Sequence, residues 1–170
     1  MKALVILTVT LVTLAILSLI FFFTREIDFA DASAPQEIIE IEIGRVHSTW
    51  WFNFTIHSAE RIDEFEGRTA APGRQLWKVV VTQTGTFFDP IMMGTFDWFM
   101  DGDYFRADVF PHGAFVGRDD MMPEYFWLER GQSETHIMLF EVPADAVNLT
   151  LNYIEFGEFE TGARFSLPLQ

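Results

Sequence analysis

The chain has 170 residues, and 25 acidic against 11 basic side chains give it a formal net charge of −14. Such a chain repels phosphate backbones, so its charge argues against nucleic-acid binding and favours cations or cationic partners, although solubility alone also accounts for an acidic surface. It contains no cysteine, which excludes disulfides, thiolate nucleophiles and zinc–thiolate sites.

The chain begins with an uninterrupted apolar run at residues 3–23. At about 1.5 Å per helical residue, this run is long enough to cross the roughly 30 Å hydrocarbon layer of a membrane. It is longer than the apolar part of most signal peptides, so we expect residues 1–24 to form an uncleaved transmembrane anchor. A small-x-small pattern at residues 30–32 leaves a cleaved signal peptide as the alternative.

The charges that flank this run predict its orientation. Lys2 precedes the run, whereas Arg25 is followed by acidic residues in the stem at 25–36. Because basic residues are retained on the cytoplasmic side, this arrangement predicts a single-pass protein of the cell membrane whose C-terminal part lies outside the cytoplasm.

Residues 37–170 have the length of one domain, and their apolar residues alternate with polar ones as in half-buried strands. The residues that share one face of a predicted strand are Ile39, Ile41 and Ile43 in the first, Trp50, Phe52, Phe54 and Ile56 in the second, and Trp77, Val79 and Val81 in the third. The polar stretch 58–74 is predicted to be a long connection. The predicted strands are 39–43, 50–57, 76–82, 95–100, 137–142, 148–153 and 164–169.

Gly, Pro and Asp residues separate these strands, and no strong amphipathic helix lies between them. Alternating helices would be needed for a parallel sheet. The pattern therefore predicts an all-β domain, an antiparallel β-sandwich preceded by one N-terminal transmembrane helix.

Several segments follow one another in the order of a known family. They are Leu76–Thr82, Phe96–Tyr104, Leu128–Ser133 and Leu139–Ala146, followed by Leu149, Leu151 and Tyr153. The region from about Glu37 to the C-terminus resembles the domain of unknown function of bacterial surface lipoproteins, which is similar to the mycobacterial immunoprotective extracellular protein. The resemblance implies an immunoglobulin-like β-sandwich outside the cell.

The chain departs from that family pattern at three places. Arg130 stands where the family usually has proline, Thr135 and His136 replace a common glycine, and the lipid-attachment cysteine is missing. The predicted anchor helix would take over the tethering role of the lipid. The family pattern contributes no catalytic residues, so it implies a fold and a location but no activity.

The residues of common catalytic sites are not spaced for catalysis. The four histidines form no i, i+4 pair, and the pair of Ser133 and His136 is explained by a turn next to a strand. We expect a protein without enzymatic activity or a cofactor, and a hydrolase with an unrecognised site is a remaining alternative.

A calcium site is a second alternative, because Asp97, Asp101 and Asp103 could supply the oxygen ligands that this cation requires. The segment lacks the EF-hand spacing. Asp101-Gly102-Asp103 is also typical of a tight turn, in which Asp bonds its own backbone and Gly tolerates positive φ. We favour the turn.

The segment 104–127 fits a sandwich poorly and is rich in aromatic residues and methionines. Such side chains make contact surfaces, and loops on a rigid sandwich often carry binding residues. The candidate binding residues are Phe110, Phe115, Tyr125, Phe126 and Trp127. The alternative is that these residues cap one end of the core.

We therefore expect a membrane-anchored, extracytoplasmic binding or interaction module with a protein partner at the cell surface. Its rivals are a structural subunit of a membrane assembly and a calcium-dependent surface module. Asn53 and Asn148 each begin a glycosylation acceptor pattern, but chance explains both patterns equally well, and we expect no glycan on either.

Overall fold

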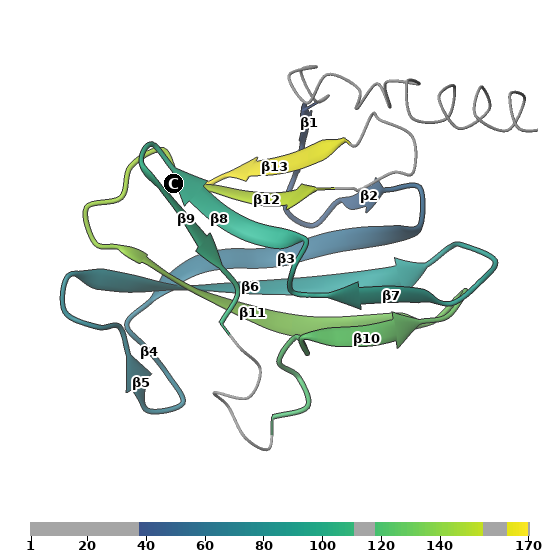
Figure 1. Cartoon of the computed structure of the whole chain (residues 1–170), viewed down its shortest axis with the longest axis horizontal. Coiled ribbons are helices and arrows are strands. Elements are labelled where there is room, and N and C mark those ends of the chain that lie inside the picture. The colour runs from purple at the N-terminus through teal and green to yellow at the C-terminus, as the bar shows by residue number, and fades with distance from the viewer. Residues whose placement is uncertain (1–37, 111–117, 155–162, 170) are drawn as a thin grey trace, which may run out of the picture. The chain divides into compact units, whose positions relative to one another are not determined.

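The computed structural model describes residues 38–110, 118–154 and 163–169 (Figure 1). These residues belong to one compact unit, Gln36–Gln170. The predicted anchor at 1–24 and the stem at 25–36 lie outside the described residues. Within the described residues, no helix has the length and apolar character needed to span a bilayer.

The described part of the chain is built from strands. They are β1 Ile38–Glu40, β2 Val46–Ser48, β3 Phe52–Ile62, β4 Glu64–Phe65, β5 Arg68–Thr69, β6 Arg74–Gly85, β7 Ile91–Gly94, β8 Trp98–Gly102, β9 Phe105–Asp108, β10 Tyr125–Leu128, β11 Ser133–Pro143, β12 Thr150–Ile154 and β13 Arg164–Pro168. The all-β prediction is confirmed.

Two larger sheets form the sandwich (Figure 1). One has the strand order β1-β13-β12-β8-β9, and the other has the order β11-β6-β3-β2. Two ribbons, β10-β7 and β4-β5, complete the described structure. The prediction of a wholly antiparallel sandwich is wrong at one place, because β1 pairs with β13, the last strand, in parallel.

Aromatic rings from both sheets fill the space between them. Phe54 of β3 contacts Trp98 of β8 and Phe165 of β13 edge-on, with ring centroids 5.5 and 5.3 Å apart. Phe52 contacts Tyr153 of β12 in the same way at 5.4 Å. Such edge-to-face pairs stabilise a core by about 0.5 to 1.5 kcal/mol beyond the burial of their area.

The predicted faces are correct for most of the core. Phe52, Phe54 and Ile56 are buried on β3, and Trp77, Val79 and Val81 are buried on β6. Trp50 and Ile43, which the alternation also placed inside, are exposed. Both residues lie outside the strands, so the period-2 rule no longer decides where their side chains point.

The prediction of a long connection at 58–74 is wrong. Strand β3 continues to Ile62, and β4 and β5 form a small hairpin before β6 begins. The register of β3 against β6 shifts between Ile56 and Ser58. A β-bulge of this kind breaks the alternation, while backbone hydrogen bonds to β6 hold polar residues in the strand.

The segment 104–127 also contains strands that the sequence did not predict. Strand β9 pairs with β8 at the edge of the five-stranded sheet, and β10 pairs with β7 in a separate ribbon. Residues 111–117 lie outside the described residues. Strand β7 of the β7–β10 ribbon lines the candidate site described below.

Candidate functional site

An apolar pocket of about 320 Å³ opens beside the β7–β10 ribbon. This volume is at the lower end of the range of about 300 to 1,000 Å³ that is usual for ligand pockets. Its walls come from the start of β3, from β7, from the turn before β8 and from β12. The lining residues are Trp51, Phe52, Ile91, Met92, Met93, Phe96, Asp97 and Tyr153.

Backbone hydrogen bonds hold two of these walls in place. The amides of Thr86 and Phe87 both donate to the carbonyl of Trp51, at 3.2 and 3.1 Å. The Trp51 and Phe87 rings then meet edge-on, with centroids 4.5 Å apart. The loop after β6 is thereby tied to the start of β3, which fixes the aromatic side of the pocket.

Asp97 is the charged residue of the pocket, and the turn that carries it is also fixed. The Trp98 amide donates to the Thr95 carbonyl at 3.1 Å, and the Ile154 amide donates to the Asp97 carbonyl at 3.2 Å. The Thr95 amide in turn donates to Glu124 at 3.3 Å. The Asp97 side chain is therefore presented from a backbone with few alternative positions.

The Asp97 side chain is 9% exposed. Burial raises the pKa of this carboxyl to about 6, because the charged form loses its hydration. No hydrogen bond or ion pair to the carboxylate is found within the described ranges. A strongly shifted carboxyl in an apolar pocket marks a candidate binding site.

The outer face of the β7–β10 ribbon continues the apolar surface beyond the pocket. Met92 lies opposite Trp127, and Gly94 lies opposite Tyr125. The side chains of Met92, Tyr125 and Trp127 are exposed. Phe88 and Phe96 are exposed nearby in the chain, and Phe96 also lines the pocket. We call Phe88, Met92, Phe96, Tyr125 and Trp127 the apolar rim.

The predicted binding residues therefore separate into different environments. Tyr125 and Trp127 belong to the apolar rim, whereas Phe126 points to the other face of β10 and packs edge-on against His136, with centroids 4.7 Å apart. Phe110 packs into a second cluster with Met121 and Leu139, and Phe115 lies outside the described residues.

Phe110 is also covered by a basic side chain. The Arg68 guanidinium carbon lies 4.0 Å from the centre of its ring, a distance typical of a cation–π contact. Phe110 is thus packed against its neighbours and does not belong to the apolar rim.

The three predicted calcium ligands are not brought together. Asp101 forms an ion pair with Arg164 at 2.7 Å and accepts hydrogen bonds from Thr150 and Asn152. Asp103 accepts from the side-chain amide of Asn148 through both oxygens, at 2.9 and 3.0 Å. Across residues 38–110, 118–154 and 163–169, no group of three or more acidic or histidine side chains is placed to hold a metal.

The same contacts bear on the glycosylation pattern at Asn148. This residue has a left-handed backbone, with φ of 52°, and its amide nitrogen is bonded to Asp103. A glycan would attach through the same nitrogen that donates this hydrogen bond to Asp103.

Ser133 and His136 do not form a catalytic pair. They are three residues apart on β11, so their side chains point to opposite faces. Ser133 bonds Thr84 across the strands at 2.8 Å, and His136 is buried beside Phe126.

Sequence reasoning missed most of the pocket. Trp51, Phe96 and Tyr153 fall in predicted strands, Met92 lies between two predicted strands, and Asp97 is predicted only as a possible metal ligand. The unused signal was the dense apolar stretch at 87–96, where three phenylalanines and two methionines stand next to turn residues.

Comparisons with known proteins identify the fold. No family model matches the chain, and no curated protein matches it. A structure of the yjhA protein from Bacillus subtilis has 16% identity and a TM-score of 0.58, with 76% of this chain and 99% of that chain covered. An uncharacterized β-sandwich protein from Clostridium difficile 630 has 10% identity and a TM-score of 0.51, with 80% and 97% covered.

A predicted lipoprotein, ycdA, from Bacillus subtilis subsp. subtilis str. 168 is also similar. It has 14% identity and a TM-score of 0.56, and the alignment covers 75% of this chain. The chain spans 39% of that protein's length. At these identities the likeness concerns the fold, and it agrees with the β-sandwich described above.

Proposed function

We propose that the protein is a membrane-anchored, extracytoplasmic binding module that captures a protein partner at the cell surface without catalysis. The observation that carries this proposal is the exposed apolar rim beside the pocket. Large apolar patches that remain exposed on a folded domain mark interaction sites more often than they mark solvent-facing structure. Aromatic residues and methionine are also enriched at protein interfaces.

The location rests on the sequence and is supported by the comparisons. The apolar run at 3–23 has the length and flanking charges of an anchor with an outside C-terminus. One neighbour in fold, ycdA, is a predicted lipoprotein, and lipoproteins are tethered at a membrane. Here the helix would replace the lipid, since the chain has no cysteine.

We also propose that the sandwich is immunoglobulin-like. Strands β6 and β11 are neighbours in one sheet, and β8, β12 and β13 are neighbours in the other. The chain passes from the first sheet to the second directly after β11, and after β6 it reaches β8 of the second sheet by way of β7. Immunoglobulin domains divide their B, E and C, F, G strands between two sheets in this way. This order supports the resemblance to the surface-lipoprotein domain and the mycobacterial protein.

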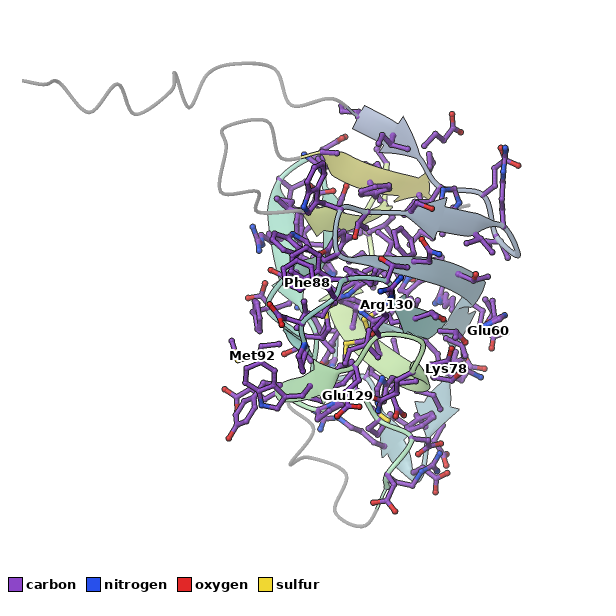
Figure 2. All side chains as sticks on the ribbon, turned by 90° about the vertical axis from the view of Figure 1, so that its right-hand side faces the viewer. Glu60, Lys78, Phe88, Met92, Glu129 and Arg130 are labelled. Atoms are coloured by element: carbon purple, nitrogen blue, oxygen red, sulfur yellow. The ribbon has the colours of Figure 1, made fainter. Side chains whose placement is uncertain are left out.

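A site-specific crosslinking experiment tests the proposal. A photoreactive residue is placed at Trp127 in the full chain, which is illuminated in its native membrane. The matched control carries the same residue at Glu60, an exposed position paired with Lys78. Figure 2 shows Met92 of the rim and Glu60 on opposite sides of the view.

The proposal predicts a discrete adduct from position 127 and none from position 60. Equal adducts from both positions would indicate random collisions. No adduct from position 127 under conditions in which the chain is correctly inserted would also contradict the proposal.

A further inference from the structure

The pocket beside the apolar rim holds a carboxylate that the protein itself does not neutralise. Asp97 is nine-tenths buried, and within the described residues its carboxylate has no hydrogen-bond or ion-pair partner. Asp101, four residues further on, shows the contrast, because Arg164, Thr150 and Asn152 all bond it. Buried charges in proteins normally have partners of this kind, as Asp101 does.

The other side chains that line the pocket cannot supply a counter-charge. Trp51, Phe52 of β3, Ile91 to Met93 of β7, and Phe96 are uncharged. Tyr153 of β12 also lines the pocket, and a phenol group carries no positive charge in either of its protonation states. A positive charge must therefore come from outside the described lining if Asp97 is to be neutralised in its ionised form.

Aromatic rings make up half of the lining. Trp51, Phe52, Phe96 and Tyr153 contribute rings to the same pocket as the carboxylate. The faces of such rings attract cations, and groups of rings bind ammonium groups in other proteins. Carboxylate and ring faces thus favour the same kind of ligand.

The charge of the whole chain acts in the same direction. A formal net charge of −14 raises the local concentration of small cations and lowers that of anions. The pocket is also small, at about 320 Å³, which suits a ligand of few heavy atoms rather than a long chain.

We propose that this pocket binds a small organic cation, an ammonium group carried on an apolar body, with Asp97 as its counter-ion. This inference rests on the proposed binding function and names a ligand class for the pocket next to the apolar rim. The ammonium group donates to the Asp97 carboxylate, at the roughly 2.7 to 2.9 Å usual for charge-assisted bonds. The apolar body packs against Trp51, Ile91 and Met92.

The probe for this proposal is 2-phenylethylammonium, compared with two ligands of similar shape. 2-Phenylethanol replaces the charge by a hydroxyl, and 3-phenylpropanoate reverses its sign. The full chain is reconstituted in phosphatidylcholine nanodiscs at pH 8, and binding is followed by calorimetry. We expect the ammonium ligand to bind at least about tenfold more tightly than the alcohol, and the anion not to bind.

Two variants separate the pocket from the general field of the protein. Asp97→Asn removes the buried charge and keeps the shape of the side chain, so it should reduce binding of the cation to the level of the alcohol. Asp89→Asn removes the same charge from an exposed position in the neighbouring loop, and it should leave binding nearly unchanged. Melting curves of both variants serve as the control that each variant is folded.

A pH titration of the wild-type chain keeps the proposal testable if Asp97→Asn does not fold. Binding of the cation should weaken as the pH falls through about 6, where the Asp97 carboxyl becomes protonated. Binding of the alcohol should not change over the same range.

Equal affinity for the ammonium ligand and the alcohol would overturn the inference. So would unchanged cation binding in Asp97→Asn, or the absence of binding by all three ligands. Success of the crosslinking at Trp127 together with any of these results would remove the cation site and leave the proposed binding module intact. Selective cation binding without an adduct from position 127 would support the cation site and contradict the proposed capture of a protein partner.

Discussion

Met92 and Trp127 lie directly opposite each other in the β7–β10 ribbon, and both side chains remain more than half exposed, at 53% and 61%. Cross-strand neighbours of this kind usually cover each other or pack on a core. The pair therefore leaves apolar surface exposed on the ribbon, as part of the apolar rim.

The first prediction concerns this pair. The double change Met92→Ser and Trp127→Ser should reduce partner crosslinking several-fold and leave the melting temperature nearly unchanged, because exposed positions usually alter stability by less than about 0.5 kcal/mol. The control is Phe126→Ser on the alternate face of β10, where the ring contacts His136. That control should lower the melting temperature, and an equal loss of stability in both variants would place Met92 and Trp127 in the core.

The second prediction tests the sandwich core. Phe140 is fully buried on β11, so Phe140→Ala should cost about 3 to 5 kcal/mol in the free energy of unfolding. Phe88→Ala, at an exposed position, should cost less than about 0.5 kcal/mol. Urea denaturation of the full chain measures both values, and a cost under about 1 kcal/mol for Phe140→Ala would show that β11 has been assigned the wrong face.

The third prediction concerns the approach of two backbones in the ribbon. A Cβ atom added at Gly94 would lie 2.1 Å from the carbonyl oxygen of Glu124. Because neither backbone can withdraw without loss of the pairing, Gly94→Ala should separate β7 from β10 and weaken partner binding. Hydrogen exchange should be faster at 91–94 and 125–128 in this variant and unchanged in β3 and β6. Unchanged exchange in the ribbon would contradict the described pairing.

The fourth prediction follows from the raised pKa of Asp97, about 6 in the folded chain. An unfolded Asp ionises near pH 4. The folded state therefore holds this proton more tightly, and Asp97 lowers stability as the pH rises from about 4 to 6, with its full cost above pH 6. Asp97→Asn should stabilise the chain by about 1 to 2 kcal/mol at pH 8, after allowance for screening by water at the pocket mouth.

At pH 4 the wild type and Asp97→Asn should have nearly equal stability, because the Asp97 carboxyl of the folded wild type is then protonated. Urea denaturation at both values of pH supplies the measurement. A variant that is less stable than the wild type at pH 8 would show that the carboxylate has a partner that neutralises it.

The sequence predicts the core strands well because their signal is local. Trp77, Val79 and Val81 are two residues apart and so share one face of a strand, and each is buried on β6 as expected. The extension of β3 beyond Ile56 could not be predicted in this way. A β-bulge shifts the register of β3 against β6 at this point. The polar residues of the extension stay in the strand because they pair with β6, which is distant in the sequence.

The pocket was less accessible to sequence reasoning than the core. Asp97 and the ring of Trp51 come together through the packing of the turn before β8 against the start of β3, and their separation along the chain gives no local signal. Tyr125 and Trp127 were predicted as binding residues from composition. That Phe126 lies between them on the opposite face follows from the pairing of β10 with β7, which the sequence did not predict.

Crosslinking mass spectrometry of the full chain in its native membrane tests the central claim most directly, because it maps where a partner touches the domain. The account predicts that crosslinked peptides fall within 87–97 and 124–128, which carry the apolar rim. Crosslinks concentrated instead on the β4–β5 hairpin at 64–69, with none from the rim, would contradict it.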